Sequence, residues 1–253
     1  MKILTWNVSG LRSFERKKDK YKIMSDMISK NKPDIICLNE TKLNEDLDIE
    51  LFKDYPYKYW SHSKIRKGYS GTAILSKIKA KKISKSPFDN EGRFIYTKFD
   101  NFSLICIYAP NSKSNLERLD YKINVWYRGL KSFLDSVKSE KIILTGDINT
   151  AHSLLDVENK KGGNRRSGWT PEERGMLAYI MKDYNLLDAF RTLNPFLVKY
   201  SFWDNKTRAR QRNVGWRLDY FLVSKKIFDK VRSSDILTDV YGSDHAPIEL
   251  ILD

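Results

Sequence analysis

Short apolar runs rich in β-branched residues recur along the whole chain, and their number restricts the fold more than any other feature. Runs of this length and composition are typical of β-strands, and there are too many for one small sheet. Two packed sheets with helices outside them would bury every run, so the sequence predicts an α/β fold of this kind. The predicted strands are residues 2–8, 35–39, 72–76, 94–99, 103–109, 142–147, 218–223 and 247–251.

Three predicted helices lie between some of these strands. The clearest covers residues 116–137, where apolar residues recur at steps of three and four. A second covers about 15–30. A third begins at Thr170, the expected N-cap, with Pro171 in the first helical position and Glu173 completing a capping box.

The connections between strands indicate mixed sheets. Residues 94–99 and 103–109 are joined by a segment of hairpin length, which is too short for a parallel crossover. No shift in composition, internal repeat or long low-complexity linker marks a boundary. We therefore expect residues 1–253 to form a single domain.

The charge of the chain favours a polyanionic partner. Its 253 residues include 46 Lys and Arg against 32 Asp and Glu, which gives a formal net charge of +14. This surplus is typical of proteins that bind nucleic acid, although biased codon usage or a solubility requirement would produce the same number. With 41% hydrophobic and 13% aromatic residues the chain can bury a sizeable core, which argues against disorder.

Several features indicate an intracellular protein. Residues 1–6 run straight into a predicted strand, so we expect no targeting segment before the fold. No apolar run approaches the ~20 residues that span a bilayer. Cys37 and Cys106 lie in apolar strand-like runs and are expected to be buried thiols. A reducing compartment fits them: the cytoplasm and nucleoid, or the nucleus if the source is a eukaryote.

Residues that can do chemistry follow several of the predicted strands. Glu40 follows one strand, Asp147 and Asn149 follow another, and His245, one of three histidines, precedes the last. Strand ends are where α/β folds place catalytic groups, because the backbone is rigid there and the loops leave room for a ligand. Each residue alone has an ordinary explanation as a cap, a turn or an ion pair. Together they form a set that suits a metal-assisted hydrolase.

Hydrolysis of a phosphodiester needs each of these groups. A hard divalent cation such as Mg²⁺ takes oxygen ligands, and Glu40 is the candidate. Asp147 and Asn149, two residues apart on one face of an extended segment, can hold and deprotonate a water. His245 paired with Asp219 would keep a fixed tautomer and tolerate positive charge beside the phosphate.

Seven short strings occur along the chain in a fixed order. They are residues 6–12 (WNVSGLR), 38–42 (LNETK), 68–71 (GYSG), 108–111 (YAPN), 146–149 (GDIN), 213–220 (NVGWRLDY) and 242–245 (GSDH). Together they resemble the exonuclease III family of apurinic/apyrimidinic (abasic-site) endonucleases, and the resemblance extends from residue 3 to residue 251.

The resemblance implies a four-layer α/β sandwich shared with pancreatic-type deoxyribonucleases (DNase I-like). It implies Mg²⁺-dependent hydrolysis of the phosphodiester 5′ to an abasic site in double-stranded DNA, with Mn²⁺ able to substitute for Mg²⁺. Exonuclease (3′–5′) and 3′-phosphodiesterase side activities are also implied. A monomer that does not associate with membranes is expected.

The resemblance also implies a role for individual residues. Glu40 falls on the metal ligand, Asp147 and Asn149 on the pair that handles the water, and Asp219 and His245 on the Asp–His pair. Tyr108 is grouped with these catalytic residues, Asn7 and Asp244 with the metal, and Asn111 with the substrate phosphate. An apolar pocket for a flipped-out abasic sugar is assigned to Phe202, Trp216 and Leu218, for which ordinary core packing is the alternative. Contacts to the DNA backbone are assigned to Arg12, Tyr69, Arg93 and Lys42.

Some positions depart from the family pattern. Asn39 stands where a glutamine is usual and Ser9 where an Asp or Asn is common; both remain polar, so we expect little loss. The basic, glycine-containing loop of residues 160–168 suits a phosphate contact, and a solvated surface loop is the equal alternative. Its unfamiliar sequence leaves open whether Gly163 or Asn164 makes that contact.

Two other functions stay open at this point. Another phosphodiesterase of the same fold, such as an inositol phosphatase, a sphingomyelinase or a nonspecific deoxyribonuclease, would share the Asp–His ending but is not expected to carry residues 213–220. A DNA-binding protein without catalysis would account for the net charge, but not for the complete set of candidate catalytic residues.

Overall fold

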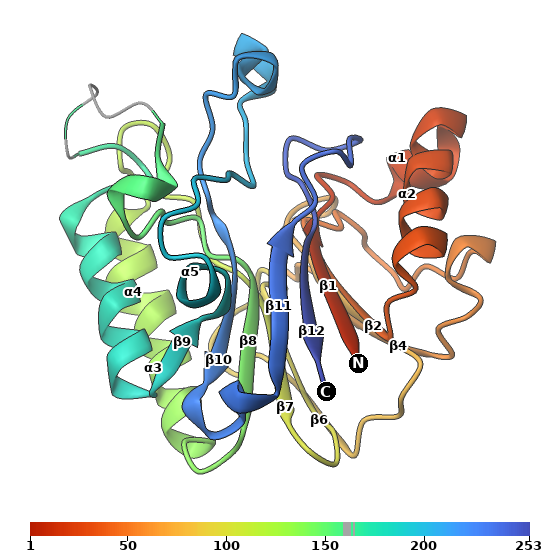
Figure 1. Ribbon diagram of the computed structural model, residues 1–253, viewed down its shortest axis with the longest axis horizontal. Coiled ribbons are helices and arrows are strands. Elements are labelled where there is room, and N and C mark those ends of the chain that lie inside the picture. The colour runs from red at the N-terminus through yellow and green to blue at the C-terminus, as the bar shows by residue number, and fades with distance from the viewer. Residues whose placement is uncertain (159–162, 164) are drawn as a thin grey trace.

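The apolar runs form the strands of two six-stranded sheets that pack face to face, with helices on both outer faces (Figure 1). The structure, a computed structural model, describes residues 1–158, 163 and 165–253. The predicted architecture of two packed mixed sheets flanked by helices is confirmed. The outer helices are α1 (Arg12–Arg16) and α2 (Lys18–Asn31) on one side and α3 (Tyr127–Ser136) and α4 (Pro171–Asp183) on the other.

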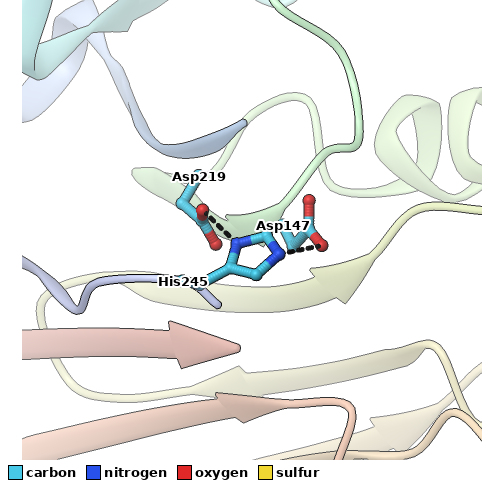
Figure 2. A group of neighbouring side chains, drawn as sticks. All are labelled: Asp147, Asp219 and His245. Carbon is cyan, nitrogen blue, oxygen red and sulfur yellow. Dashed lines mark hydrogen bonds and ion pairs between the residues drawn. The ribbon is translucent and has the colours of Figure 1, made fainter. Parts of the chain in front are cut away.

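Each sheet has a parallel pair of strands near its centre and antiparallel strands around it. The first sheet has the order β11-β12-β1-β2-β4-β3, and β1 (Lys2–Asn7) runs parallel to β2 (Ile35–Asn39). The second has the order β5-β6-β7-β8-β10-β9, and β7 (Ser103–Tyr108) runs parallel to β8 (Ile142–Asp147). The carboxyl ends of these central strands lead into the region drawn in Figure 2.

The eight predicted strands all form, and four more strands were not predicted. The four are the outermost strands of the two sheets. Three of these edge strands are partly exposed and carry charged residues, and the fourth is only three residues long, so none has the continuous apolar run that marks a buried strand. The predicted ones are β1, β2, β7 and β8 with β4 (Thr72–Ser76), β6 (Phe94–Lys98), β10 (Asp219–Ser224) and β12 (Ile248–Leu252). The edges are β3 (Tyr57–Ser61), β5 (Lys82–Lys85), β9 (Leu186–Asp188) and β11 (Val231–Ile236).

The helix predictions are confirmed in part. Thr170 caps α4, and its hydroxyl accepts a hydrogen bond from the Glu173 backbone N–H at 3.2 Å. The helix expected over 116–137 begins later, because Leu116 takes a left-handed backbone angle of φ 62°. It starts with a π-helical turn, η2 (Tyr121–Trp126), and continues as α3. The helix expected at about 15–30 is divided into α1 and α2 by an extended residue, Lys17. A short fifth helix, α5 (Ala189–Leu193), follows β9.

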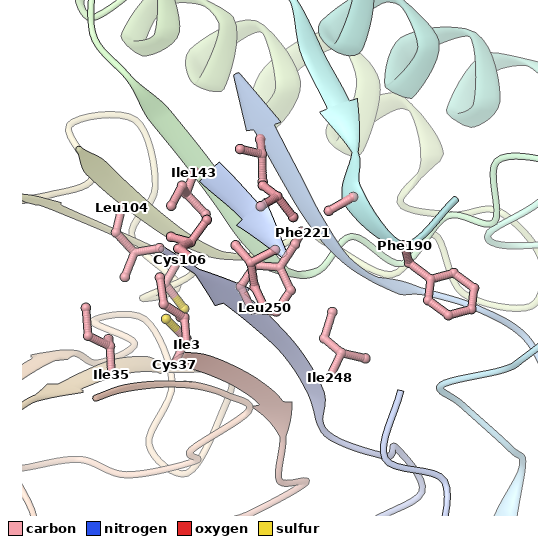
Figure 3. Packing of buried hydrophobic residues seen from close by; sticks show 14 of the residues in the cluster. Ile3, Ile35, Cys37, Leu104, Cys106, Ile143, Phe190, Phe221, Ile248 and Leu250 are labelled. Carbon is pink, nitrogen blue, oxygen red and sulfur yellow. The ribbon is translucent and has the colours of Figure 1, made fainter. Parts of the chain in front are cut away.

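The main core lies between the two sheets, where apolar side chains from both meet (Figure 3). Ile3 and Ile35 come from the first sheet, and Leu104 and Ile143 come from the second. Two further clusters fill the space between each sheet and its outer helices. Cys37 and Cys106 are buried free thiols in the main core, as predicted.

None of the helices in the described ranges combines the length and the apolar character needed to cross a bilayer.

Candidate functional site

Hydrogen bonds join the two sheets where their central strands end. Asn39, the last residue of β2, donates a hydrogen bond from Nδ2 to the Ile107 carbonyl at 2.9 Å and accepts one at Oδ1 from the Asp147 backbone N–H at 3.2 Å. Gly146 allows this close packing, since a Cβ there would lie 1.9 Å from the Ile107 carbonyl oxygen of the neighbouring strand and 3.1 Å from Asn39 Oδ1 of the other sheet. The asparagine that replaces the usual glutamine therefore joins the sheets directly behind the site.

The loops that carry Glu40 hold several non-glycine residues in left-handed backbone conformations. Glu40 has φ 51° and Lys42 φ 53°, and the facing loops contribute Ser9 at φ 47° and Ser70 at φ 53°. Such conformations are unfavourable for L-residues and persist only where surrounding contacts enforce them. Their gathering around one carboxylate indicates that the loops are shaped to present Glu40.

Glu40 is held by three donors. Its Oε1 accepts hydrogen bonds from Tyr108 Oη at 2.6 Å and Asn7 Nδ2 at 3.2 Å, and its Oε2 lies 2.9 Å from Lys42 Nζ. Burial alone would raise the pKa of Glu40, but attraction to Lys42 and then the Tyr108 hydrogen bond outweigh it and lower the pKa. Burial and the nearby Glu40 charge raise the pKa of Tyr108, so the phenol remains a donor. Glu40 thus presents an ionised carboxylate at neutral pH.

Asp147 is buried and is held by two amides. Its Oδ1 accepts from the Asn149 backbone N–H at 2.8 Å, and its Oδ2 accepts from Asn7 Nδ2 at 2.9 Å and Asn149 Nδ2 at 3.2 Å. Burial and then repulsion from Asp219 raise the pKa of Asp147 to about 7, against the attraction of His245. A carboxylate with a pKa near neutrality is suited to exchange a proton with a water.

His245 lies between two carboxylates (Figure 2). Its Nδ1 is 2.8 Å from Asp219 Oδ2, and its Nε2 is 3.8 Å from Asp147 Oδ2. Ser201 Oγ donates to the same Asp219 oxygen at 2.7 Å and fixes that carboxylate. Burial disfavours the imidazolium, but attraction to Asp219 and then to Asp147 outweighs burial and raises the pKa of His245 to about 10. The ring therefore carries positive charge, as the sequence indicated for an Asp–His pair.

Two sets of residues could hold a cation. Asp147, Asp219 and His245 each offer an atom within 4.8 Å of the others. A cation among them would have to break the 2.8 Å hydrogen bond between His245 Nδ1 and Asp219 Oδ2. Glu40 and Asp244 line the same cavity as Asp147 and His245 and offer the carboxylate oxygens that a hard cation prefers. Glu40 and Asp244 provide an all-oxygen donor set, and a cation bound at Glu40 Oε2 would have to displace Lys42 Nζ, which lies 2.9 Å away.

Asn7, predicted to lie at the metal, contacts both carboxylates of the site. Its Oδ1 accepts a hydrogen bond from the Ser9 backbone N–H at 3.0 Å, which fixes the amide orientation and turns Nδ2 toward Glu40 and Asp147. Asn7 thereby acts as a donor that bridges the two carboxylates. The sequence could not predict this orientation, because an asparagine offers either an oxygen or an N–H and its neighbours decide which. The metal role of Asn7 stays a prediction.

The candidate residues surround one cavity of about 420 Å³. Asn111 reaches into it and donates from Nδ2 to Asn149 Oδ1 at 3.0 Å. Isolated β-bridges join the backbone of Phe202 to that of both Trp216 and His245. These bridges fix the imidazole relative to Phe202 and Trp216, which form the aromatic wall of the cavity. The lining residues predicted from sequence are Glu40, Tyr108, Asn111, Asp147, Asn149, Phe202, Trp216, Leu218, Asp244 and His245.

A buried arginine anchors the aromatic wall from behind. Arg217 is 1% exposed, and its guanidinium makes a bidentate pair with Asp188 at 3.1 and 2.7 Å and a third contact with Asp156 at 2.8 Å. Because Arg217 stands between Trp216 and Leu218 in the chain, this network fixes the position of both pocket residues.

The ion pair of Asp156 predicts a pH dependence of folding stability. Burial alone would raise the pKa of Asp156, but Arg217 outweighs it and lowers the pKa from 3.8 to about 2. A folded-state pKa below the unfolded one contributes stability above about pH 4, worth about 2 kcal/mol, and this contribution disappears as the pH falls through 2. The free energy of unfolding, measured in urea, should therefore be larger for the unsubstituted protein than for Asp156→Asn at pH 4. This difference should shrink between pH 4 and pH 2. A difference in free energy of unfolding that stays constant over this pH range would show that Asp156 has an ordinary pKa.

The residues assigned to the DNA backbone lie outside the cavity. Arg12 is partly exposed and pairs with Glu45 at 3.1 Å, and Lys42 pairs with Glu40. Arg93 is a correction: it is 1% exposed, and its guanidinium donates to Tyr69 Oη and to the Tyr108 carbonyl. A side chain enclosed in this way does not reach a phosphate, so it supports Tyr69 and Tyr108 instead.

Two further residues of the site were not predicted: Ser201, which fixes Asp219, and Asp204, which lines the cavity. Ser167 and Gly168, at the end of the loop for which a phosphate contact was considered, also line the cavity. Ser201 and Asp204 flank Phe202 in the sequence, and this adjacency was the one available signal. Of the loop considered for a phosphate contact, Lys160, Lys161, Gly162 and Asn164 lie outside the described residues, and Gly163 is exposed.

Comparisons with known proteins agree with this geometry. The endonuclease/exonuclease/phosphatase family model matches residues 4–245. The exodeoxyribonuclease of Bacillus subtilis (strain 168) is 38% identical over 258 residues, which cover 100% of this chain and 99% of that protein. The DNA repair nuclease APEX1 of Danio rerio is 39% identical over 261 residues, covering 100% and 82%. The solved AP endonuclease LMAP of Leishmania major has a TM-score of 0.88 at 29% identity, over 99% of this chain and 87% of that one. The expected DNase I-like sandwich is thereby confirmed.

Proposed function

The chain belongs to the endonuclease/exonuclease/phosphatase family and is a hydrolytic nuclease that acts on DNA, and from this premise we propose that its substrate is the abasic site. The proposed reaction is hydrolysis of the phosphodiester 5′ to an abasic site in double-stranded DNA. One observation carries the proposal. The cavity that holds Glu40, Asp147 and His245 is continuous with a wall made by Phe202 and Trp216.

This wall supports lesion recognition by size. A deoxyribose without its base is small and has already lost its stacking, so turning it out of the duplex costs least. A cavity of about 420 Å³ that must also contain the phosphate and the cation leaves little room for an attached base. Selection would therefore depend on exclusion of intact nucleotides, and contacts to a particular base are not required.

Mg²⁺ is the proposed cofactor, with Mn²⁺ as a substitute. Glu40 and Asp244 would hold the cation, and their carboxylate oxygens suit a hard ion that keeps several of its waters. When bound, the cation neutralises charge on the phosphate and on the leaving oxygen. Lys42 beside Glu40 would add to this positive field.

The protein's own groups account for the other parts of the reaction. Asp147, oriented by Asn149 and Asn7, would hold the attacking water and accept its proton. The imidazolium of His245, kept charged and oriented by Asp219, would stabilise negative charge that develops on the phosphate. Tyr108 would keep the Glu40 carboxylate in place.

A duplex with one abasic analogue tests the proposal directly. The protein should cut 5′ to the lesion in Mg²⁺, and EDTA should stop the reaction. Nicking at random positions would instead indicate a nonspecific deoxyribonuclease of the same fold. DNA that is retarded in a gel but never cut would indicate a binding protein without catalysis.

Trp216 is expected to control lesion selectivity. The substitution Trp216→Ala opens the cavity wall, so the ratio of cleavage at the abasic analogue to cleavage at an intact nucleotide should fall by about 10-fold or more. Affinity for undamaged duplex should change much less, because backbone contacts dominate it. Steady-state cleavage of matched duplexes gives the ratio, with Trp216→Phe as a control that keeps a ring in place. Unchanged discrimination in the alanine variant would remove Trp216 from the pocket.

Further parts of the proposal rest on the relatives. Exonuclease activity from a 3′ end and 3′-phosphodiesterase activity are proposed as side reactions of the same site. We also propose that the protein acts as a monomer, since one chain supplies every group of the site, and that it acts inside the cell, where the DNA is.

A further inference from the structure

A buried ion pair contacts segments of the chain that line the cavity, and the proposed reaction does not use this pair. Lys122, in the π-helical turn η2, and Glu173, in the first turn of α4, both have side chains that are 0% exposed. Lys122 Nζ and Glu173 Oε1 are 2.9 Å apart. Placing two charges where no water reaches them is expensive, and apolar residues of similar volume are often equally stable. Stability alone therefore does not explain the pair.

The ammonium group of Lys122 uses all three of its protons. Besides Glu173, it donates to the Asn149 carbonyl at 2.7 Å and to Thr150 Oγ1 at 2.9 Å. Asn149 has the left-handed angle φ 51°, and its side-chain amide holds Asp147. Lys122 therefore holds the backbone of Asn149, and Asn149 in turn orients Asp147, the proposed water-binding carboxylate.

Glu173 accepts hydrogen bonds from two other segments that line the cavity. Its Oε1 also accepts from Ser112 Oγ at 2.7 Å, next to Asn111 in the chain. Its Oε2 accepts from the Gly168 backbone N–H at 2.9 Å. Asn111, Asn149 and Gly168 all line the cavity. Three segments that are distant in sequence are thus attached to one pair of charges.

The local structure around Lys122 agrees with a special role. The turn η2 is π-helical, a rare conformation that proteins use mostly at functional sites. It precedes α3, which packs on the outer face of the second sheet, so Lys122 is carried on a rigid element.

We propose that Lys122 and Glu173 are a positioning pair that sets the geometry of Asn149 and Asn111 in the cavity and so acts on the rate of the reaction. The inference rests on the proposed function for its kinetic part. Displacement of a positioned group by about 1 Å can slow an enzyme on the order of 100-fold without changing what it binds. The pair should therefore affect kcat far more than KM.

The test uses three variants of the full chain. Lys122→Met removes the ammonium and leaves Glu173 buried without its partner. Lys122→Met combined with Glu173→Gln removes both charges and keeps an acceptor for Gly168 and Thr170. Met24→Ala creates a cavity between α2 and the first sheet, on the side of the molecule away from α3 and α4. It is the control for a loss of stability that does not act through Lys122. Each is measured by thermal unfolding, by cleavage of the abasic-analogue duplex in Mg²⁺, and by hydrogen exchange of the free protein.

The positioning pair predicts one pattern. Both Lys122 variants should lose at least about 10-fold in kcat with KM within about threefold, and exchange should quicken at residues 149–151 but not along β8. The double variant should recover thermal stability and not kcat, because the Asn149 carbonyl still lacks its donor. Met24→Ala should lose stability and keep kcat well below its unfolding temperature.

Other patterns overturn the inference. If kcat returns together with stability in the double variant, or falls equally in Met24→Ala, the pair is only structural. Unchanged exchange at 149–151 shows that Lys122 does not hold this segment, whatever the activity. Absence of lesion cleavage by the unsubstituted protein would reject the proposed function, and the exchange experiment would still decide whether the pair fixes the wall.

Discussion

Replacing Asp147 by asparagine is expected to slow cleavage beside an abasic site by about 10³-fold, while the affinity for the uncut duplex stays the same or rises. Asparagine has nearly the same shape, so the backbone N–H of Asn149 keeps an acceptor at Oδ1. The change removes the negative charge that would accept a proton from water. It also removes one of the charges that hold His245 as an imidazolium.

The effect should appear in the chemical step. Single-turnover cleavage of a lesion duplex at saturating protein separates that step from binding, and a filter or anisotropy titration in EDTA gives the affinity. Asp100→Asn is the matched control, because Asp100 is an exposed carboxylate that lies outside the cavity lining. A rate within about tenfold of the unsubstituted protein would mean that Asp147 does not handle the water.

Replacing Glu40 by glutamine is expected to raise the Mg²⁺ concentration needed for half-maximal cleavage on the order of 100-fold. The amide can still accept from Tyr108, so the fold around it should persist, but it carries no charge for the cation. Its NH₂ would also face Lys42, which now contacts the carboxylate at 2.9 Å. Binding of the duplex in EDTA should be unchanged.

A titration of the single-turnover rate against Mg²⁺ measures this shift. Glu50→Gln is the control, since Glu50 is an exposed carboxylate whose side chain is 71% accessible and which pairs only with the exposed Lys53 among the ion pairs of the described residues. If Glu40→Gln and the unsubstituted protein have the same rate at every Mg²⁺ concentration, Glu40 is not a ligand of the cation.

The central part of the fold could be predicted from the sequence, and the edges could not. The strands β1, β2, β7 and β8 are covered on both faces and therefore read as continuous apolar runs. The edge strand β5 has the sequence KISK and is mostly exposed, so nothing in its pattern separates it from a loop. Helix α4 was located correctly because its capping box is local in sequence.

Much of the candidate site was predicted as well, but its hydrogen bonding was not. The motifs indicated which residues gather around the cavity, and the structure brings Glu40, Asp147 and His245 together there. The orientation of the Asn7 amide and the burial of Arg93 were not predicted, because both depend on neighbours that are remote in sequence. For the same reason no pattern pointed to Lys122, whose partners lie 27 to 51 residues further along the chain.

The most direct test is a crystal structure of Asp147→Asn with an abasic-analogue duplex and Mn²⁺, whose anomalous scattering locates the ion. The account predicts one strong peak at coordination distance from a Glu40 oxygen, about 2.0–2.3 Å, with the base-free sugar turned out of the helix against Phe202 and Trp216. An ion held by Asp219 and His245 without Glu40, or a sugar that stays stacked within the duplex, would contradict it.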